Sequence, residues 1–469
     1  MAARSWSNIN RDLDRFVKGE MRRTSVPGAA VGILYKGRRF TNGYGVTNVN
    51  HPLPVTADTL FQIGSTTKTF TATAIMRLVE EGKLDLDTRV RRYLPELRLR
   101  DEEAARKVTL RHLLTHMGGW VGDYFVNAGW GDDALQQVVS KMARVKQLTP
   151  LGTVWSYSNS GFYIAGRVIE KVTKQTFEQA IKEMLFDPLE MRDSHFFATD
   201  VMLHRFAVGH ITNGKKSAVA SPWRGSRGGA PAGGIASTAP DQLRWAEFHM
   251  GDGRAPGGKR LLKKSTLRLM QKEQVHVGSM TESIGISWML NNVGGVKLVR
   301  HGGTTNGQLS AFLMVPERQF AVTVLTNSTR GRELHPSVVR WALTNYLGIT
   351  DERPATAKVD PATLAKYAGK YRIEATGQII EVTAGTRRLV LQFPQPEPAD
   401  TRSAPRVPPI PVQFYASDRF IGSAGPYAGL RGDFLRSPAG RITWLRFGGR
   451  LYRRVSETVA ARAMARSKS

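Results

Sequence analysis

The sequence predicts an α+β protein in two parts: a mixed sheet with a helical domain, followed by a small antiparallel β-barrel. Three observations lead to this prediction. Strand patterns occur at both ends of residues 1–347, and helical patterns lie between them. Residues 348–362 combine glycine, prolines and small or charged residues, which is typical of a linker. Short strand patterns with turns fill residues 363–455, and residues 456–469 form a basic tail.

The first part begins with apolar residues at helical spacing over residues 9–23, which predicts an amphipathic helix. Apolar runs at 29–35 and 39–45 follow around a Lys-Gly turn and predict a strand pair. A long apolar-rich helix is expected over 66–81 and a last helix over 333–346. Strand patterns return before that last helix, at residues 284–290, 296–300, 309–315 and 319–326. One mixed sheet assembled from both ends of this part explains the order.

The second part contains seven short strand candidates separated by turns, which predict a small antiparallel sheet or barrel. They are residues 367–373, 377–383, 388–393, 412–415, 419–421, 431–436 and 442–446. A proline-rich stretch, 394–411, interrupts them and is expected to form an extended loop.

The composition limits the function. The chain has 469 residues, 41% hydrophobic and 23% charged, as in an ordinary globular protein. It has no cysteine, which excludes disulfides, thiolate catalysis and cysteine-ligated zinc. The net charge of +28 favours anionic partners. The basic residues are scattered and no nucleic-acid motif accompanies them, so we expect no nucleic-acid partner.

Neither a signal-peptide pattern nor an apolar run long enough to span a membrane is visible in the sequence. We therefore expect a cytoplasmic protein without integral membrane contact, while export with a trimmed signal stays open. The oligomeric state also stays open, with a homo-oligomer as one option.

The most informative motif is Ser65-Thr66-Thr67-Lys68, which lies where a predicted strand meets the long predicted helix. Residues three apart share one helix face, so the Lys68 amine can reach the Ser65 hydroxyl. A serine is a weak nucleophile until a base accepts its proton, and a lysine with a lowered pKa can do so. Taken alone, the motif is more simply explained by a capping serine and an exposed lysine.

A second motif is Tyr157-Ser158-Asn159. A tyrosine phenol can relay protons, and an asparagine amide can orient both a lysine and a substrate carbonyl. Taken alone, the motif is better explained as a polar loop that caps the following helix.

A third motif, His301-Gly302-Gly303-Thr304, ends a predicted strand. Glycines there let a substrate approach an edge strand closely. The backbone N–H of Thr304 would then pair with that of Ser65 as an oxyanion hole. A tight turn with a surface histidine is the structural alternative.

His112 and His116 have the i, i+4 spacing of zinc-binding helices. The zinc motif also needs a glutamate after the first histidine, where this chain has Leu113. We therefore expect a structural pair and no metal site.

Together, the three motifs resemble the S-x-x-K, Y-x-N and K-T-G set of serine β-lactamases and penicillin-binding proteins. Residues 113–116 and 231–241 resemble two further segments of that family. Over roughly residues 10–346, the chain is most similar to the class C β-lactamase branch. That branch also holds D-aminopeptidases, D,D-carboxypeptidases and family VIII esterases. The second part resembles the lipocalin-like barrel appended to some D-aminopeptidase relatives.

The resemblance implies roles for the motif residues. Ser65 would form the acyl-enzyme, while Lys68 and Tyr157 would share the proton transfers. The Ser65 and Thr304 amides would form the oxyanion hole. The remaining motif residues would bind the substrate: Asn159, His301, Gly302 and Gly303. Neither a cofactor nor a metal ion is implied.

His301 is the main departure from the family pattern. The family has a lysine at this position, which offers a fixed cation to a substrate carboxylate, whereas the charge of a histidine depends on pH. Relatives with His-x-Gly are often peptidases or esterases, so efficient β-lactam hydrolysis is less expected.

We therefore expect a serine hydrolase that cleaves ester, amide or D-amino-acid peptide bonds of a small-molecule or peptide substrate through a Ser65 acyl-enzyme. Two alternatives stay open: a class C-like β-lactamase, and a non-catalytic penicillin-binding or sensor protein. The natural substrate, its stereochemistry and the acyl acceptor are left undetermined. For the second part, we hypothesise that its proline-rich loop reaches over the catalytic mouth and limits substrate size. A packing module or a dimerisation surface is equally expected.

Overall fold

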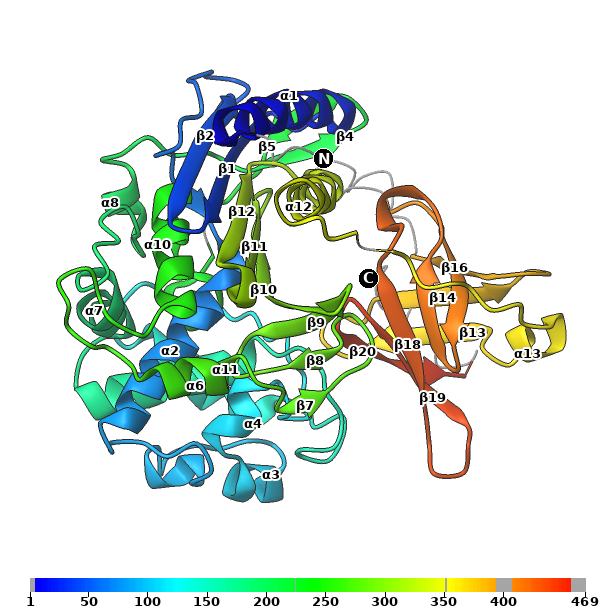
Figure 1. Cartoon of the computed structure of the whole chain (residues 1–469). Helices are drawn as coiled ribbons and strands as arrows, with labels where there is room; N and C mark the ends of the chain where they lie inside the picture. The colour runs from blue at the N-terminus through cyan, green and yellow to red at the C-terminus, as the bar shows by residue number, and fades with distance from the viewer. Residues whose placement is uncertain (1–4, 224, 351, 394–406, 457–469) are drawn as a thin grey trace.

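The computed structural model describes residues 5–223, 225–350, 352–393 and 407–456. Figure 1 shows two parts side by side, a larger one in which helices flank a sheet and a smaller β-barrel. The predicted α+β class, with a helical domain and a small antiparallel barrel, is therefore confirmed.

The large sheet has eight strands in the order β2-β1-β12-β11-β10-β9-β8-β7. Its strands are β1 (Gly28–Tyr35), β2 (Arg38–Gly45), β7 (Val275–His276), β8 (Ser283–Ile284), β9 (Met289–Val293), β10 (Val296–Thr304), β11 (Leu309–Val315) and β12 (Phe320–Thr326). Strand β1 pairs with β12, so the two ends of the first part meet in one sheet, as predicted.

The direction of the strands differs from the prediction, because the large sheet is antiparallel rather than mixed. Strands β7 to β12 follow one another through turns, which reverses the chain at each step. The β1–β2 hairpin then enters beside β12 in the opposite direction.

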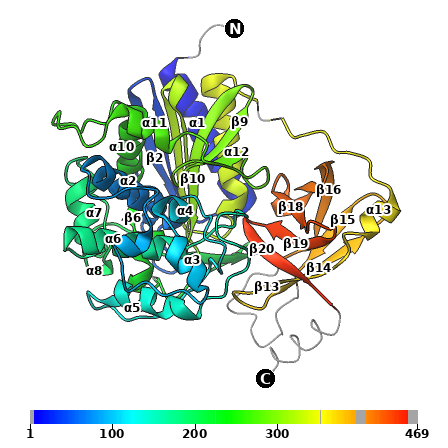
Figure 2. The same cartoon turned by 90° about the horizontal axis from the view of Figure 1, so that it is seen from below.

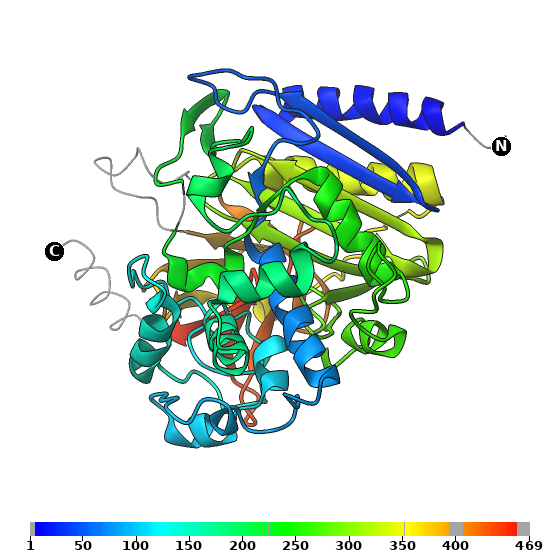
Figure 3. The same cartoon turned by 90° about the vertical axis from the view of Figure 1, so that its left-hand side faces the viewer.

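Helices cover both faces of this sheet. On one face lie α1 (Trp6–Thr24) and α12 (Gly331–Leu347), and on the other lie α2 (Thr67–Glu80) and α10 (Ala239–Met250). Side chains of β1 alternate between the two cores, with Val31 and Ile33 on the α1 side and Ala30 and Leu34 on the α2 side. Figure 3 shows α1, in dark blue, beside the β1–β2 hairpin.

The remaining elements of the first part come between β2 and β7 in the sequence. The helices are α3 (Glu102–Lys107), α4 (Leu110–Leu114), α5 (Ala134–Ser140), α6 (Ser160–Thr173), α7 (Phe177–Ile181), α8 (Ala198–Val201), α9 (Ala230–Gly233) and α11 (Lys264–Met270). Two small sheets pair β3 (Phe61–Gln62) with β6 (Ala236–Ser237) and β4 (His210–Asn213) with β5 (Lys216–Val219). The predicted strand over 284–290 is divided between β8 and β9 because Ser287 turns the chain with a φ of 67°.

The second part is a closed eight-stranded antiparallel barrel, preceded by α13 (Pro361–Ala365). Its strands are β13 (Gly369–Ile373), β14 (Ile379–Ala384), β15 (Leu389–Gln392), β16 (Ile410–Ala416), β17 (Arg419–Gly422), β18 (Arg431–Arg436), β19 (Ile442–Phe447) and β20 (Arg450–Val455). Seven of them match predicted strands. The eighth, β20, was not predicted, because its three arginines interrupt the alternation of apolar and polar residues.

Strands β19 and β20 form the side of the barrel that faces the larger part (Figure 2). A buried ion pair lies at this junction, where Arg446 Nη2 is 2.6 Å from Asp433 Oδ2. Arg446 also donates hydrogen bonds to the backbone oxygens of Trp155 (3.0 Å) and Val277 (2.9 Å), which belong to the larger part. Arg446 therefore joins the barrel to the larger part.

Residues 352–360 form neither helix nor strand and lead from the larger part to α13. Most of the proline-rich stretch, residues 394–406, lies outside the described residues. Among the helices of the described ranges, none combines the length and the apolar character that crossing a bilayer requires.

Arg446→Met tests the role of this ion pair. The change leaves Asp433 buried without its cation and leaves two backbone oxygens without their donor. Breaking a buried pair costs about 3–5 kcal/mol, so we expect a loss of that size in the free energy of unfolding, measured by urea denaturation. Arg441→Met, at an exposed turn between β18 and β19, is the control and is expected to cost under about 0.5 kcal/mol. Equal stability of the two variants would contradict the assignment.

Candidate active site

Ser65 lies in a short 3₁₀ turn, Gly64–Thr66, that leads from β3 into α2. Lys68 follows on the first turn of α2 and its side chain is completely buried. Its Nζ atom lies 3.0 Å from Ser65 Oγ, 2.6 Å from Asn159 Oδ1 and 2.7 Å from the backbone oxygen of Ala232. The predicted contact between lysine and serine is therefore present.

The surroundings of Lys68 favour its neutral form. Burial lowers the pKa of Lys68 well below that of a free lysine, and the charge of Arg450 lowers it further, whereas Asp123 opposes both. A neutral amine has two N–H donors and one lone pair. Its donors match the oxygens of Asn159 and Ala232, which leaves the lone pair for the Ser65 hydroxyl. Lys68 is thus placed to accept the serine proton.

Tyr157 lies beside this pair and is buried. Its ring centroid is 5.0 Å from Lys68 Nζ, and it stacks on the His116 ring with a centroid distance of 4.4 Å. Burial raises the pKa of Tyr157 above that of a free phenol, while the charge of Arg450 and a hydrogen bond with Ser65 oppose the shift. Tyr157 is therefore a neutral phenol next to the nucleophile and can relay a proton.

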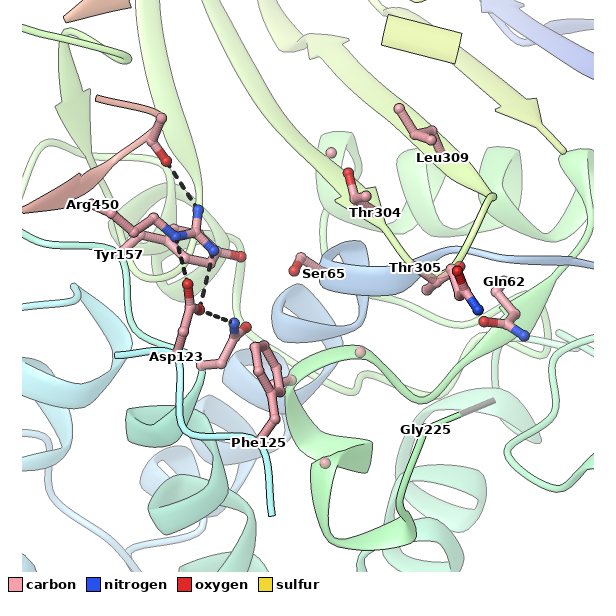
Figure 4. Close-up of a pocket in the computed structure, with 18 of the residues that line it drawn as sticks. Gln62, Ser65, Asp123, Phe125, Tyr157, Gly225, Thr304, Thr305, Leu309 and Arg450 are labelled. Carbon is pink, nitrogen blue, oxygen red and sulfur yellow. Dashed lines mark hydrogen bonds and ion pairs between the residues drawn. The ribbon is translucent and has the colours of Figure 1, made fainter. Parts of the chain in front are cut away.

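The third motif lies inside β10 and runs against the Ser65 turn. A Cβ atom at Gly64 would lie 2.8 Å from the Thr304 nitrogen, and one at Gly303 would lie 2.7 Å from the Ser65 nitrogen. Such distances are too short for a side chain, so glycine is needed on both sides of the contact. This close approach supports the predicted pairing of the Ser65 and Thr304 amides. Figure 4 shows Ser65 between Thr304 and the side chain of Tyr157.

His301 lies behind the cavity wall instead of on it. Its side chain is buried, Nδ1 lies 2.8 Å from the backbone oxygen of Gly302, and its ring centroid is 6.3 Å from that of Tyr157. Burial lowers the pKa of His301 to about 3, so the ring is neutral near pH 7. Gly302 and Gly303 do line the cavity, whereas His301 is not among the lining residues.

Three residues of the site were not predicted from the sequence: His116, Asp123 and Arg450. His116 accepts a hydrogen bond from the Ser158 nitrogen (3.0 Å), which fixes the second motif. Asp123 accepts one from Asn159 Nδ2 (2.6 Å) and forms an ion pair with Arg450, whose Nε lies 3.0 Å from Asp123 Oδ2 (Figure 4). A Gly-Gly turn precedes Arg450 in the sequence, but such a signal predicts a hairpin and not what the hairpin contacts.

A cavity of about 1420 Å³ opens in front of Ser65 and is lined by both parts of the chain. Aromatic side chains from the two parts surround it: Tyr124, Phe125, Trp130, Trp223, Phe393, Tyr427, Phe447 and Tyr452. Phe125 and Trp130 are 76% and 55% exposed at its rim. The cavity therefore has room for a large substrate with apolar groups.

Comparison with known proteins gives matches over most of the chain. The family model described as Beta-lactamase matches residues 13–343. Penicillin-binding protein 4 of Amycolatopsis lactamdurans is 34% identical over 74% of this chain and 94% of that protein. The crystal structure of SurE, which was also solved with D-Leu, has a TM-score of 0.74 at 24% identity and covers 96% of this chain and 100% of SurE. An octameric penicillin-binding protein homologue from Pyrococcus abyssi has a TM-score of 0.64 at 24% identity, over 94% of this chain and 98% of its own.

Gly303→Ala tests the close approach of β10 to the Ser65 turn. The added methyl group would meet the Ile63 oxygen at 1.8 Å, so the strand has to move away from Ser65. We expect the rate at which p-nitrophenyl acetate acylates Ser65 to fall by about 10²–10³, the usual effect of losing one oxyanion donor. The rate is measured from the intact mass of the protein over time. Gly257→Ala, which has open space around it, is the control. An unchanged rate in Gly303→Ala would show that the Thr304 amide plays no part.

Proposed function

The chain belongs to the β-lactamase family, and from this we propose that it cleaves ester, amide or D-amino-acid peptide bonds through an acyl-enzyme on Ser65. One observation carries the proposal: a completely buried lysine whose Nζ lies 3.0 Å from the oxygen of Ser65. A buried lysine with a lowered pKa is a general base, and a serine beside a general base is a nucleophile.

Acylation then follows from the positions of these groups. Neutral Lys68 accepts the Ser65 proton while Oγ attacks the substrate carbonyl. The Ser65 and Thr304 amides stabilise the negative charge that develops on the carbonyl oxygen. The Tyr157 hydroxyl gives its proton to the leaving group, which departs as an alcohol or an amine, and the proton held by Lys68 passes to Tyr157 in its place.

Deacylation uses the same groups in reverse. A water molecule, or an amine as acyl acceptor, replaces the leaving group and, as it attacks the ester, gives one proton through Tyr157 to Lys68. Ser65 recovers its proton when the second tetrahedral intermediate collapses. An aminolysis product is thus a second outcome of the same site.

The charge and shape of the site support the proposed substrate class. Neutral His301 offers no cation where the K-T-G motif of β-lactamases has a lysine, which disfavours a β-lactam and favours an ester or a peptide. The aromatic walls of the cavity suit an apolar acyl group. The D-Leu complex of SurE supports a D-amino-acid substrate, and the octameric homologue makes a homo-oligomer the assembly to test.

Ser65→Ala is the direct test of the nucleophile. We expect the wild-type chain to turn over at least one of three substrates: a p-nitrophenyl short-chain ester, a D-alanine anilide or a chromogenic cephalosporin. Ser65→Ala should lose both the turnover and the acyl mass shift, because the change removes the oxygen that attacks the substrate. Ser265→Ala, on the exposed side of α11, is the matched control.

The outcomes separate the alternatives. Turnover of the cephalosporin alone would favour the β-lactamase. A stable acyl mass shift without turnover would favour a penicillin-binding sensor protein. Turnover that survives in Ser65→Ala would sink the proposal.

The pH dependence of kcat/KM tests whether Lys68 is the general base. Because only unprotonated Lys68 accepts the proton, kcat/KM should rise with pH through the pKa of Lys68 and then level off. The lowered pKa places this acid limb well below the range of a free lysine. His301→Gln should leave the limb where it is, since the pKa of His301 is about 3. A limb that disappears in His301→Gln would assign the titration to the histidine instead.

A further inference from the structure

The turn between β19 and β20 of the barrel inserts into the active site of the larger part. The backbone nitrogen of Tyr157 donates a hydrogen bond to the Gly449 oxygen (2.8 Å). Gly449 has a φ of 78°, and a Cβ atom there would lie 3.2 Å from the Trp155 ring and 3.3 Å from Tyr157 Cβ. The hairpin backbone therefore packs directly against the second catalytic motif, and little but glycine fits at the contact.

Arg450 is the first residue of β20 and extends from this turn toward the site. Its side chain is 30% exposed, and its partner Asp123 is 16% exposed. Two of its nitrogens hold the Asp123 carboxylate, with Nε 3.0 Å from Oδ2 and Nη2 3.2 Å from Oδ1. The guanidinium also lies 4.5 Å from the centroid of the Tyr157 ring, within the range of a cation–π contact.

Asp123 in turn fixes the orientation of the Asn159 amide. Asn159 Nδ2 donates to Asp123 Oδ1 (2.6 Å), and its other end, Oδ1, accepts from Lys68 Nζ (2.6 Å). The two ends of an amide are not equivalent, so a reversed amide would point N–H groups at the lysine. Asp123 selects the one orientation in which Asn159 presents an acceptor to Lys68.

We propose that Arg450, supplied by the barrel, is a positioning residue of the catalytic site. By holding Asp123 it fixes the Asn159 amide, which directs Lys68 Nζ at Ser65, and it holds the ring of Tyr157. The barrel is then part of the catalytic machinery as well as a wall of the cavity. The inference rests on the proposed acyl transfer by Ser65 and adds a residue to it.

The charges around Lys68 give this role a specific signature. The titratable groups that face Lys68 come from several elements: Arg450, Asp123, Tyr157, His116 and His301. Burial lowers the pKa of both histidines and raises that of the tyrosine, so these three are neutral near pH 7. Arg450 lowers the pKa of Lys68 and Asp123 raises it.

Arg450→Met and Asp123→Asn should therefore both lower kcat but should move the acid limb of kcat/KM in opposite directions. Both changes break the contacts that lead from Arg450 through Asp123 to Asn159. Because misplacing a catalytic group by about 1 Å can cost about 10²-fold in rate, we expect kcat to fall about 10²-fold in each variant. Removing the cation raises the pKa of Lys68 and moves the acid limb of kcat/KM to higher pH. Removing the carboxylate lowers that pKa and moves the limb to lower pH.

The experiment uses the full chain and the substrate that the wild-type protein turns over. We compare kcat, KM and the acid limb for Arg450→Met, Asp123→Asn, the double variant and Arg450→Lys, with Arg453→Met on the exposed face of β20 as control. We expect kcat to fall with little change in KM, and the double variant to be no worse than the worse single variant, because the residues act as one unit. Arg450→Lys should recover part of kcat, since it restores the charge without the two-nitrogen contact.

Three results would overturn the inference while leaving the proposed function intact. The first is a wild-type kcat in folded Arg450→Met, and the second is an increase in KM in that variant with kcat unchanged. The third is an acid limb of kcat/KM that moves in the same direction in Arg450→Met and Asp123→Asn. Asp123→Asn keeps the side-chain shape, so wild-type kcat in that variant overturns the inference even if Arg450→Met does not fold. Absence of Ser65-dependent acylation in the wild-type chain would instead contradict the proposed function.

Discussion

The site depends on the burial of a single lysine. Moving an ammonium group out of water costs several kcal/mol, and this cost lowers the pKa of Lys68 and favours its neutral form. The neutral amine still has polar atoms that need partners in a buried place. Asn159 and Ala232 supply two oxygens, and the Ser65 hydroxyl meets the remaining lone pair. The same arrangement that makes the burial tolerable therefore supports the proposed role of Ser65 as the nucleophile.

Holding Lys68 in this position requires α2 to be fixed on all sides. Most residues of α2 are buried, and several of them are threonines whose hydroxyls bond to neighbouring backbone. Thr71 donates to the Pro231 oxygen (2.7 Å), and Thr67 accepts from the Ile235 nitrogen (3.2 Å). The glycine-rich segment around α9 is thus attached to α2 on both sides of Ala232. This attachment places the Ala232 backbone oxygen 2.7 Å from the lysine nitrogen.

The sequence predicts those parts of the site that depend on local geometry. Ser65 and Lys68 share a helix face because of their spacing, and the glycines near Thr304 indicate a close approach. The charge state of His301 was not predictable, because it depends on burial by residues distant in the sequence. Asp123 and Arg450 lie outside any periodic pattern, and their partnership spans two parts of the chain. The strand that begins with Arg450 was also missed, because arginines replace the alternation that identifies a strand.

The position of Arg450 has a consequence for how the two parts of the chain depend on each other. Arg446 fastens the barrel to the backbone of Trp155 and Val277, and Arg450 lies just beyond the next turn. The contact that docks the barrel and the contact that orders Asn159 are therefore carried by one hairpin. Any shift of the barrel large enough to break the first contact also moves the second, since a two-residue glycine turn separates the strands. Under the proposed role of Arg450, docking of the barrel and alignment of Lys68 are thus one event.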